Sequence, residues 1–123
     1  MANLKYSTKQ SIEELFDMSN GCVLDFSNDS FQRFIKEIIN IDIYEDFGYE
    51  DYCSNANKLR QILTKESNLK VAKLLNKLLN YCENYKIQNN NLTDYDKKKI
   101  NDIRKDIKEL KEKTMKMVAW MKN

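Results

Sequence analysis

Acid–base and nucleophilic side chains are unevenly represented in this chain of 123 residues, which has 19 Asp and Glu but no histidine. The missing histidine excludes Ser-His-Asp and Cys-His nucleophile systems and histidine-ligated metals. Two isolated glycines, Gly21 and Gly48, cannot form a phosphate-binding loop. We therefore expect no enzymatic activity, no cofactor and no small-molecule substrate. A hydrolytic site made of two carboxylates is the enzymatic alternative, although the spacing of the acids does not predict one.

Asp25 is the acid with the most unusual surroundings, because Val23, Leu24 and Phe26 beside it are apolar. It is either a functional acid or a structural carboxylate that accepts hydrogen bonds from nearby backbone N–H groups. We favour the structural role, because no second catalytic partner lies nearby in the sequence.

The three cysteines, Cys22, Cys53 and Cys82, are widely separated and lack the spacing of a metal site. Their odd number and separation indicate reduced thiols, most of them buried. Residues 1–10 contain no apolar leader segment, and no apolar run approaches the length of a membrane span. We therefore expect a cytoplasmic protein.

Residues 21–31 are the connection around which the predicted helices are arranged. Ser7 is predicted to open the first helix, and Gly21 is predicted to end it. Ser27 is the predicted N-cap of a second helix that ends near Asn40. Phe26 and Phe31 have the spacing of a hydrophobic staple, which fixes the angle at which the chain enters that helix.

Three further helices are predicted from caps and apolar periodicity. The third starts at Ser54 or Asn55, and the fourth is capped by Ser67 and is apolar enough to be the centre of the bundle. Thr93 caps the last helix, which continues to the C-terminus. The expected fold is all-α, a single domain built as a compact bundle of about five helices with a long C-terminal helix. The predicted body is 7–86, the linker 87–92 and the last helix 93–122.

Residues 41–53 contain acids and aromatics without a clear period, so we expect a loop with at most one helical turn. An irregular connector with aromatics against the core is the simpler interpretation. The alternative is a recognition surface for a protein partner, made of Tyr44, Phe47, Tyr49 and Tyr52.

The last helix carries a heptad-like seam formed by Ile100, Ile103, Ile107, Leu110, Thr114, Met117 and Met121. The seam either packs along its own bundle or binds a partner, including a second copy of the chain, and the sequence leaves both open. The partner-binding candidates in it are Ile107, Leu110, Met117 and Met121.

Residues 93–123 contain ten Lys and Arg against six Asp and Glu. A nucleic-acid-binding regulator that uses this basic helix is the alternative function. Acids surround the run Lys97-Lys98-Lys99, which favours a solvated helix face over a phosphate site. The end around Trp120 is amphipathic, but it is short and only lightly basic. A contact between helices is therefore a better explanation of it than docking to a membrane surface.

The segment Gly21-Cys22-Val23-Leu24-Asp25-Phe26-Ser27, followed by Phe31 and Phe34, resembles the N-terminal helical domain of AbiJ-type abortive-infection proteins. The resemblance covers roughly residues 7–85 and includes the runs 41–44 and 54–60, with Cys22 in place of an aromatic residue. It implies an adaptor or sensor module that works with a toxic effector, commonly a nuclease. The expected function is thus a non-enzymatic protein–protein adaptor in bacterial anti-phage defence. Residues 93–123 lack the Arg-x-His type motif of helical ribonucleases, so the resemblance implies either a module of a longer effector or a stand-alone partner of a separate one.

Overall fold

The computed structural model describes residues 2–45 and 54–122. This part of the chain contains five α-helices, one 3₁₀ turn and no strand. The elements are α1 (Tyr6–Leu15), η1 (Met18–Asn20), α2 (Asn28–Ile39), α3 (Asn55–Lys65), α4 (Asn68–Gln88) and α5 (Asp94–Lys122). The prediction of an all-α bundle with a long C-terminal helix is confirmed.

Four helices begin at the predicted hydroxyl caps. Ser27, Ser54 and Ser67 accept hydrogen bonds from the N–H groups of Ser30, Asn57 and Lys70, at the starts of α2, α3 and α4. At the start of α5, the Asp96 N–H donates to the Thr93 hydroxyl (3.0 Å), and the Thr93 N–H donates back to the Asp96 carboxylate (3.3 Å). These bonds satisfy amide groups that lack a partner inside the helix, so the caps fix where each helix starts.

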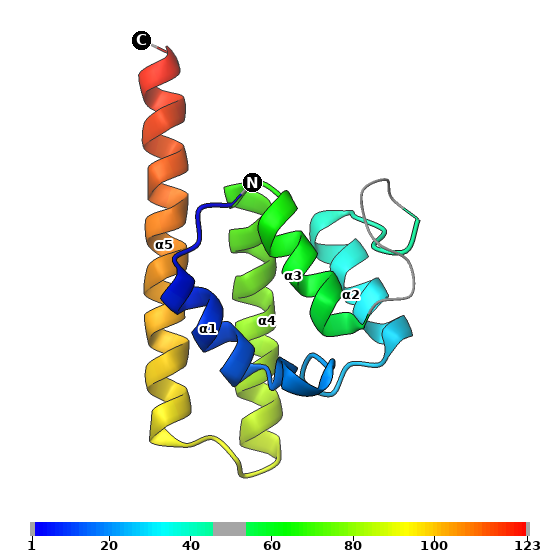
Figure 1. Ribbon diagram of the computed structural model, residues 1–123. Helices are drawn as coiled ribbons and strands as arrows, with labels where there is room; N and C mark the ends of the chain where they lie inside the picture. The colour runs from blue at the N-terminus through cyan, green and yellow to red at the C-terminus, as the bar shows by residue number, and fades with distance from the viewer. Residues whose placement is uncertain (1, 46–53, 123) are drawn as a thin grey trace.

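Helix α4 lies at the centre of the bundle, as predicted, because it packs against both α2 and α5. Its buried face consists of Val71, Ala72, Leu74, Leu75, Leu78, Leu79 and Cys82. Figure 1 shows α5 running beside α4 in the opposite direction, with α1 crossing both and with α2 and α3 on the other side of α4. Helices from both ends of the chain therefore contribute side chains to the same core.

The first helix differs from the prediction at both ends. It begins at Tyr6, with Lys5 in the N-cap position and no side-chain cap, so Ser7 does not cap it. It ends at Leu15, because Asp17 adopts a left-handed conformation (φ 52°) that breaks the helix and leads into η1. Gly21, with φ 87°, ends η1 instead of α1. The break lets Phe16 and Met18 both enter the core, which a continuous helix would not place on one face.

The connection from α4 to α5 is shorter than the predicted linker. Helix α4 continues through Ile87 to Gln88, and the next helix begins at Asp94. Asn90 takes a left-handed conformation (φ 56°), which asparagine tolerates better than most residues. Asn90 is therefore well suited to its place in the reversal of the chain between the two helices.

Candidate functional site

The end of α5 exposes a concentration of large apolar side chains. Met117 is 65% exposed, Trp120 is 78% exposed and Met121 is 72% exposed, and Met115 and Val118 are also open to solvent. We call residues Met115–Met121 the tip. Figure 1 shows this part of α5 projecting past the first turn of α4. A group of exposed apolar residues is typical of an interaction surface, whereas single exposed ones are ordinary.

Asn68 marks the point where α5 leaves the body. Its side-chain amide donates to the Thr114 hydroxyl (3.1 Å), and its side-chain oxygen accepts from the Asn3 N–H (2.9 Å). One side chain at the start of α4 thus holds both the N-terminal segment and α5. Beyond Thr114, all the residues of the tip are exposed.

A groove of about 570 Å³ lies between the tip and the first turn of α4. We call it the tip groove; it is lined by Asn3, Ser67, Asn68, Leu69, Lys113, Thr114, Lys116, Met117, Val118 and Met121. Met117 and Met121 in this region were predicted as binding residues, whereas Leu69 and Val118 were not. Leu69 is an exposed apolar residue at the first turn of a capped helix, off the buried stripe, and that position is the signal that could have found it.

The predicted seam divides into two parts with different roles. Ile107 and Leu110, expected at a partner-binding surface, are 1% and 3% exposed, because this part of α5 packs in the core against α1 and α4. Ile100 and Ile103 are also buried there. Met117 and Met121 belong to the exposed part. The structure therefore leaves only the second half of the seam open to a partner.

The acidic aromatic segment is described only as far as Glu45, and Phe47, Tyr49 and Tyr52 lie outside the described residues. Tyr44 is half-buried, and the ammonium of Lys58 lies 4.9 Å from the centre of its ring. Lys58 is fully buried and donates a hydrogen bond to the Ile43 carbonyl (2.8 Å). These contacts anchor residues 43–44 on α3, so Tyr44 packs against the body.

Asp25 has a structural partner that lies far away in the sequence. It accepts a hydrogen bond from the Tyr81 hydroxyl on α4 (2.5 Å). The Tyr81 ring stacks on Phe26, with ring centroids 4.4 Å apart, and Phe26 packs against Phe31 (5.5 Å), as the staple spacing predicted. Burial, and then the bond to Asp25, raise the pKa of Tyr81 to about 12. Asp25 thus has a structural partner, which is a phenol and not the predicted backbone amide.

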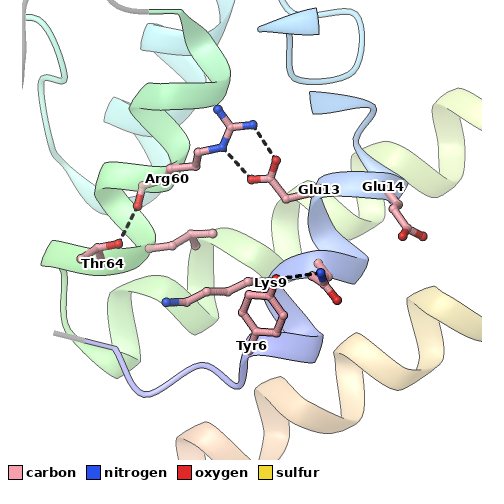
Figure 2. Close-up of a pocket in the computed structure, with 8 residues that line it drawn as sticks. Tyr6, Lys9, Glu13, Glu14, Arg60 and Thr64 are labelled. Atoms are coloured by element: carbon pink, nitrogen blue, oxygen red, sulfur yellow. Dashed lines mark hydrogen bonds and ion pairs between the residues drawn. The ribbon is translucent and has the colours of Figure 1, made fainter. Parts of the chain in front are cut away.

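A second groove, of about 530 Å³, lies between α1 and α3 (Figure 2). Within it, Arg60 donates to both carboxylate oxygens of Glu13 (2.7 and 2.5 Å). That bond raises the pKa of the Arg60 guanidinium. Glu14 points away from Arg60 in Figure 2 and pairs with Lys99 of α5. The two neighbouring carboxylates are therefore separated and neutralised, which does not resemble a pair of catalytic acids.

Three acids of α5 line a third groove beside the N-terminal segment: Asp102, Asp106 and Glu109. Asp106 accepts a hydrogen bond from the buried Thr8 hydroxyl (2.7 Å), and Glu109 pairs with Lys5 (3.4 Å). Among the described residues, no group of three or more His, Cys, Asp or Glu is placed to hold a metal ion. This groove therefore holds structural contacts between the two ends of the chain.

Three basic residues in the first half of α5 pair with acids. Lys97 pairs with Asp94 (3.8 Å), Lys99 with Glu14, and Arg104 with Glu83 (3.5 Å). These pairs reduce the positive charge that α5 presents to a phosphate backbone. Within 2–45 and 54–122, no helix is long and apolar enough to cross a membrane.

Comparison of the chain with protein-family models, with curated proteins and with solved structures gave no match. The resemblance of residues 7–85 to the AbiJ-type N-terminal domain therefore stays a prediction.

Proposed function

We propose that this protein is a non-enzymatic interaction module that binds a protein partner through the tip of α5. The observation that carries the proposal is the exposure of Met115, Met117, Val118, Trp120 and Met121 on one projecting helical end. Burying large apolar side chains of this kind is the main source of affinity in protein interfaces. Met residues suit such a surface, because their flexible side chains adapt to the shape of a partner.

Two further observations favour binding over catalysis. The carboxylates of the α1–α3 groove pair with cations, and beside the N-terminal segment Asp106 bonds to Thr8 and Glu109 to Lys5. Three of the basic residues that would serve the nucleic-acid alternative, Lys97, Lys99 and Arg104, pair with acids. The tip, by contrast, has no role in the core that would explain its apolar composition.

The test is capture of partners from a lysate of the native host by the intact protein and by the double variant Met117→Asp, Met121→Asp. Tyr95→Asp is the matched control, because Tyr95 is an exposed apolar residue at the other end of the same helix. We expect the wild-type protein and the control to retain the same specific partner and the double variant to lose it. All three should melt at similar temperatures, because both methionines lie outside the core. Equal capture by all three would contradict the proposal.

A role in anti-phage defence is proposed on the resemblance of residues 7–85 alone, with this chain as an adaptor for a separate effector. The measurement is the number of phage plaques on the native host after deletion and complementation. Wild-type protein should restore protection, and the Met117→Asp, Met121→Asp variant should not. If the deletion leaves plaque numbers unchanged for a panel of phages, the defence role is wrong. The proposal that the protein is an interaction module is not affected by that result.

A further inference from the structure

The tip groove has an apolar floor that lysines border. Met117, Val118 and Met121, which we call the apolar strip, continue the buried face of α5, because they follow Leu110 at helical spacing. Lys113 and Lys116 line the groove on one side of this strip, and helical periodicity places Lys111 on the other. Glu112, the single acid of residues 111–121, falls on the opposite face of the helix. The surroundings of the apolar strip are therefore positive on both sides.

The start of α4 adds charge of the same sign. Ser67 and Asn68 line the groove at the N-terminus of this helix of 21 residues, where the helix dipole is positive. Glu66, the acid next to this turn in the sequence, pairs with Lys70 (3.6 Å). The two helices that form the groove thus both present a positive electrostatic potential to a bound partner.

The dimensions of the groove match one α-helix. From Thr114 to Lys122, α5 rises about 12 Å past the point where Asn68 holds it, and an α-helix with side chains is about 10–12 Å wide. A helix lying across the start of α4 would contact Leu69 on one side and the strip of Met117 and Met121 on the other. A groove lined by two helices fits a cylinder better than the flat surface of a bilayer.

We propose that the tip groove binds an amphipathic helix of a partner protein, and that Asp or Glu residues border the apolar stripe of that helix. The inference rests on the proposed interaction function and specifies the chemistry of the partner. Acidic residues would meet Lys111, Lys113 and Lys116 while the apolar stripe covers the strip, which is the usual helix-in-groove mode. A second copy of this chain is a poorer occupant, because it would bring two sets of lysines together.

Trp120 provides a fluorescence reporter beside the groove, because it is the only tryptophan of the chain and follows the groove residues Lys116 and Met117 by one helical turn. The probes are two designed helical peptides of about 18 residues, or five turns, with Leu at positions i, i+3, i+4 and i+7. One carries Glu at its remaining positions and the other carries Lys. With the full chain at low salt, we expect the Glu peptide to shift Trp120 emission to the blue and to bind at least about tenfold more tightly than the Lys peptide. High salt should reduce this difference.

Charge reversal gives the matched variants. Lys113→Glu with Lys116→Glu should invert the preference between the two peptides, whereas Lys98→Glu with Lys108→Glu, at exposed positions outside the groove, should leave it unchanged. Circular dichroism shows whether each variant is folded. The Met117→Asp, Met121→Asp variant should lose the response to both peptides.

The outcomes separate this inference from the interaction function. Equal binding of both peptides, lost in the Met117→Asp, Met121→Asp variant, overturns the acidic partner and supports an apolar docking site. A shift with phosphatidylglycerol vesicles but with neither peptide assigns the tip to membranes and overturns both proposals. A mass that doubles with concentration in light scattering makes a second copy the occupant and overturns the inference. The absence of any shift also overturns it, and partner capture then decides the interaction function alone.

Discussion

Tyr81 shows how a single residue links the loop before α2 to the centre of the bundle. Its ring stacks on Phe26, and its hydroxyl donates to the carboxylate of Asp25. Both the burial of the phenol and its charged acceptor favour the neutral form, and its pKa rises from the ordinary value of 10.0 to about 12. Asp25 and Tyr81 are 56 positions apart, so no local pattern in the sequence could have paired them.

This shift predicts a loss of stability at high pH. Between pH 10 and about 12 the unfolded chain releases the Tyr81 proton while the folded chain keeps it, so the free energy of unfolding falls. Below pH 10, wild-type protein should be more stable than Tyr81→Phe by about 1 kcal/mol, because the variant lacks the hydrogen bond. Urea denaturation across this range should show the difference shrinking above pH 10, since Phe does not titrate. A difference that stays constant up to pH 12 would contradict the shift.

The two described cysteines should differ strongly in reactivity. Cys22 is exposed, whereas Cys82 is fully buried and its burial raises the thiol pKa to about 11. At pH 8 only roughly a thousandth of such a thiol is ionised, and the thiolate is the reactive species. In a Cys53→Ser variant, a thiol reagent should label one cysteine per chain quickly and the second only after denaturant is added. Rapid labelling of both thiols in the native protein would show that Cys82 is accessible.

At the scale of elements, local sequence signals predicted where helices begin better than where they end. The hydroxyl caps at Ser27, Ser54, Ser67 and Thr93 are confirmed, because a cap is decided by residues within one turn. The end of α1 was wrong, because the break at Asp17 is favoured by long-range packing and not by a glycine or proline. A non-glycine residue in the left-handed region costs energy locally, and here the burial of neighbouring side chains offsets that cost.

The candidate site shows a second limit of sequence patterns. The seam of α5 has the same periodicity on both sides of Thr114, yet Leu110 is buried and Met117 is exposed. Periodicity shows that a face must be covered and does not say by which segment. The distinction depends on where α4 begins, because the body covers α5 only as far as that helix extends.

The contact between α4 and α5 near the tip depends on Asn68. Replacing it with Ala removes the bonds to Asn3 and Thr114, and we expect a loss of about 1–2 kcal/mol in the free energy of unfolding. Amide hydrogen exchange in residues 111–116 should become faster, because α5 loses its last hydrogen bond to the body. Asn84→Ala, at an exposed position of α4, is the control and should change neither quantity by much. Unchanged exchange in Asn68→Ala would mean that apolar packing alone holds this part of α5.

At the scale of the whole molecule, α5 combines a core helix with a free end. The four buried residues Ile100, Ile103, Ile107 and Leu110 fill the space between α1 and α4. Each such side chain contributes about 1.5–3 kcal/mol when fully buried, so together they match the net stability of an ordinary domain. The body of residues 7–86 is therefore incomplete without the first half of α5.

Two truncations test this division. A chain of residues 1–92 should be unfolded or aggregated, because it loses all four of these core residues. A chain of residues 1–114 should fold as a monomer with nearly the full free energy of unfolding, since it keeps them and Thr114. Gel filtration with light scattering and circular dichroism measure both properties. A folded monomer of residues 1–92 would show that α5 is an appendage.

The packing of α1 against α5 has a consequence for the protein during its synthesis. Thr8 of α1 bonds to Asp106 of α5 across 98 positions. The first helix to leave the ribosome therefore cannot make its final contacts until the first half of α5 has emerged. Until then, the apolar surfaces of α1 and α4 that α5 covers stay exposed, and chaperones bind such surfaces. The nascent chain is therefore at greatest risk of aggregation in the interval before α5 is translated.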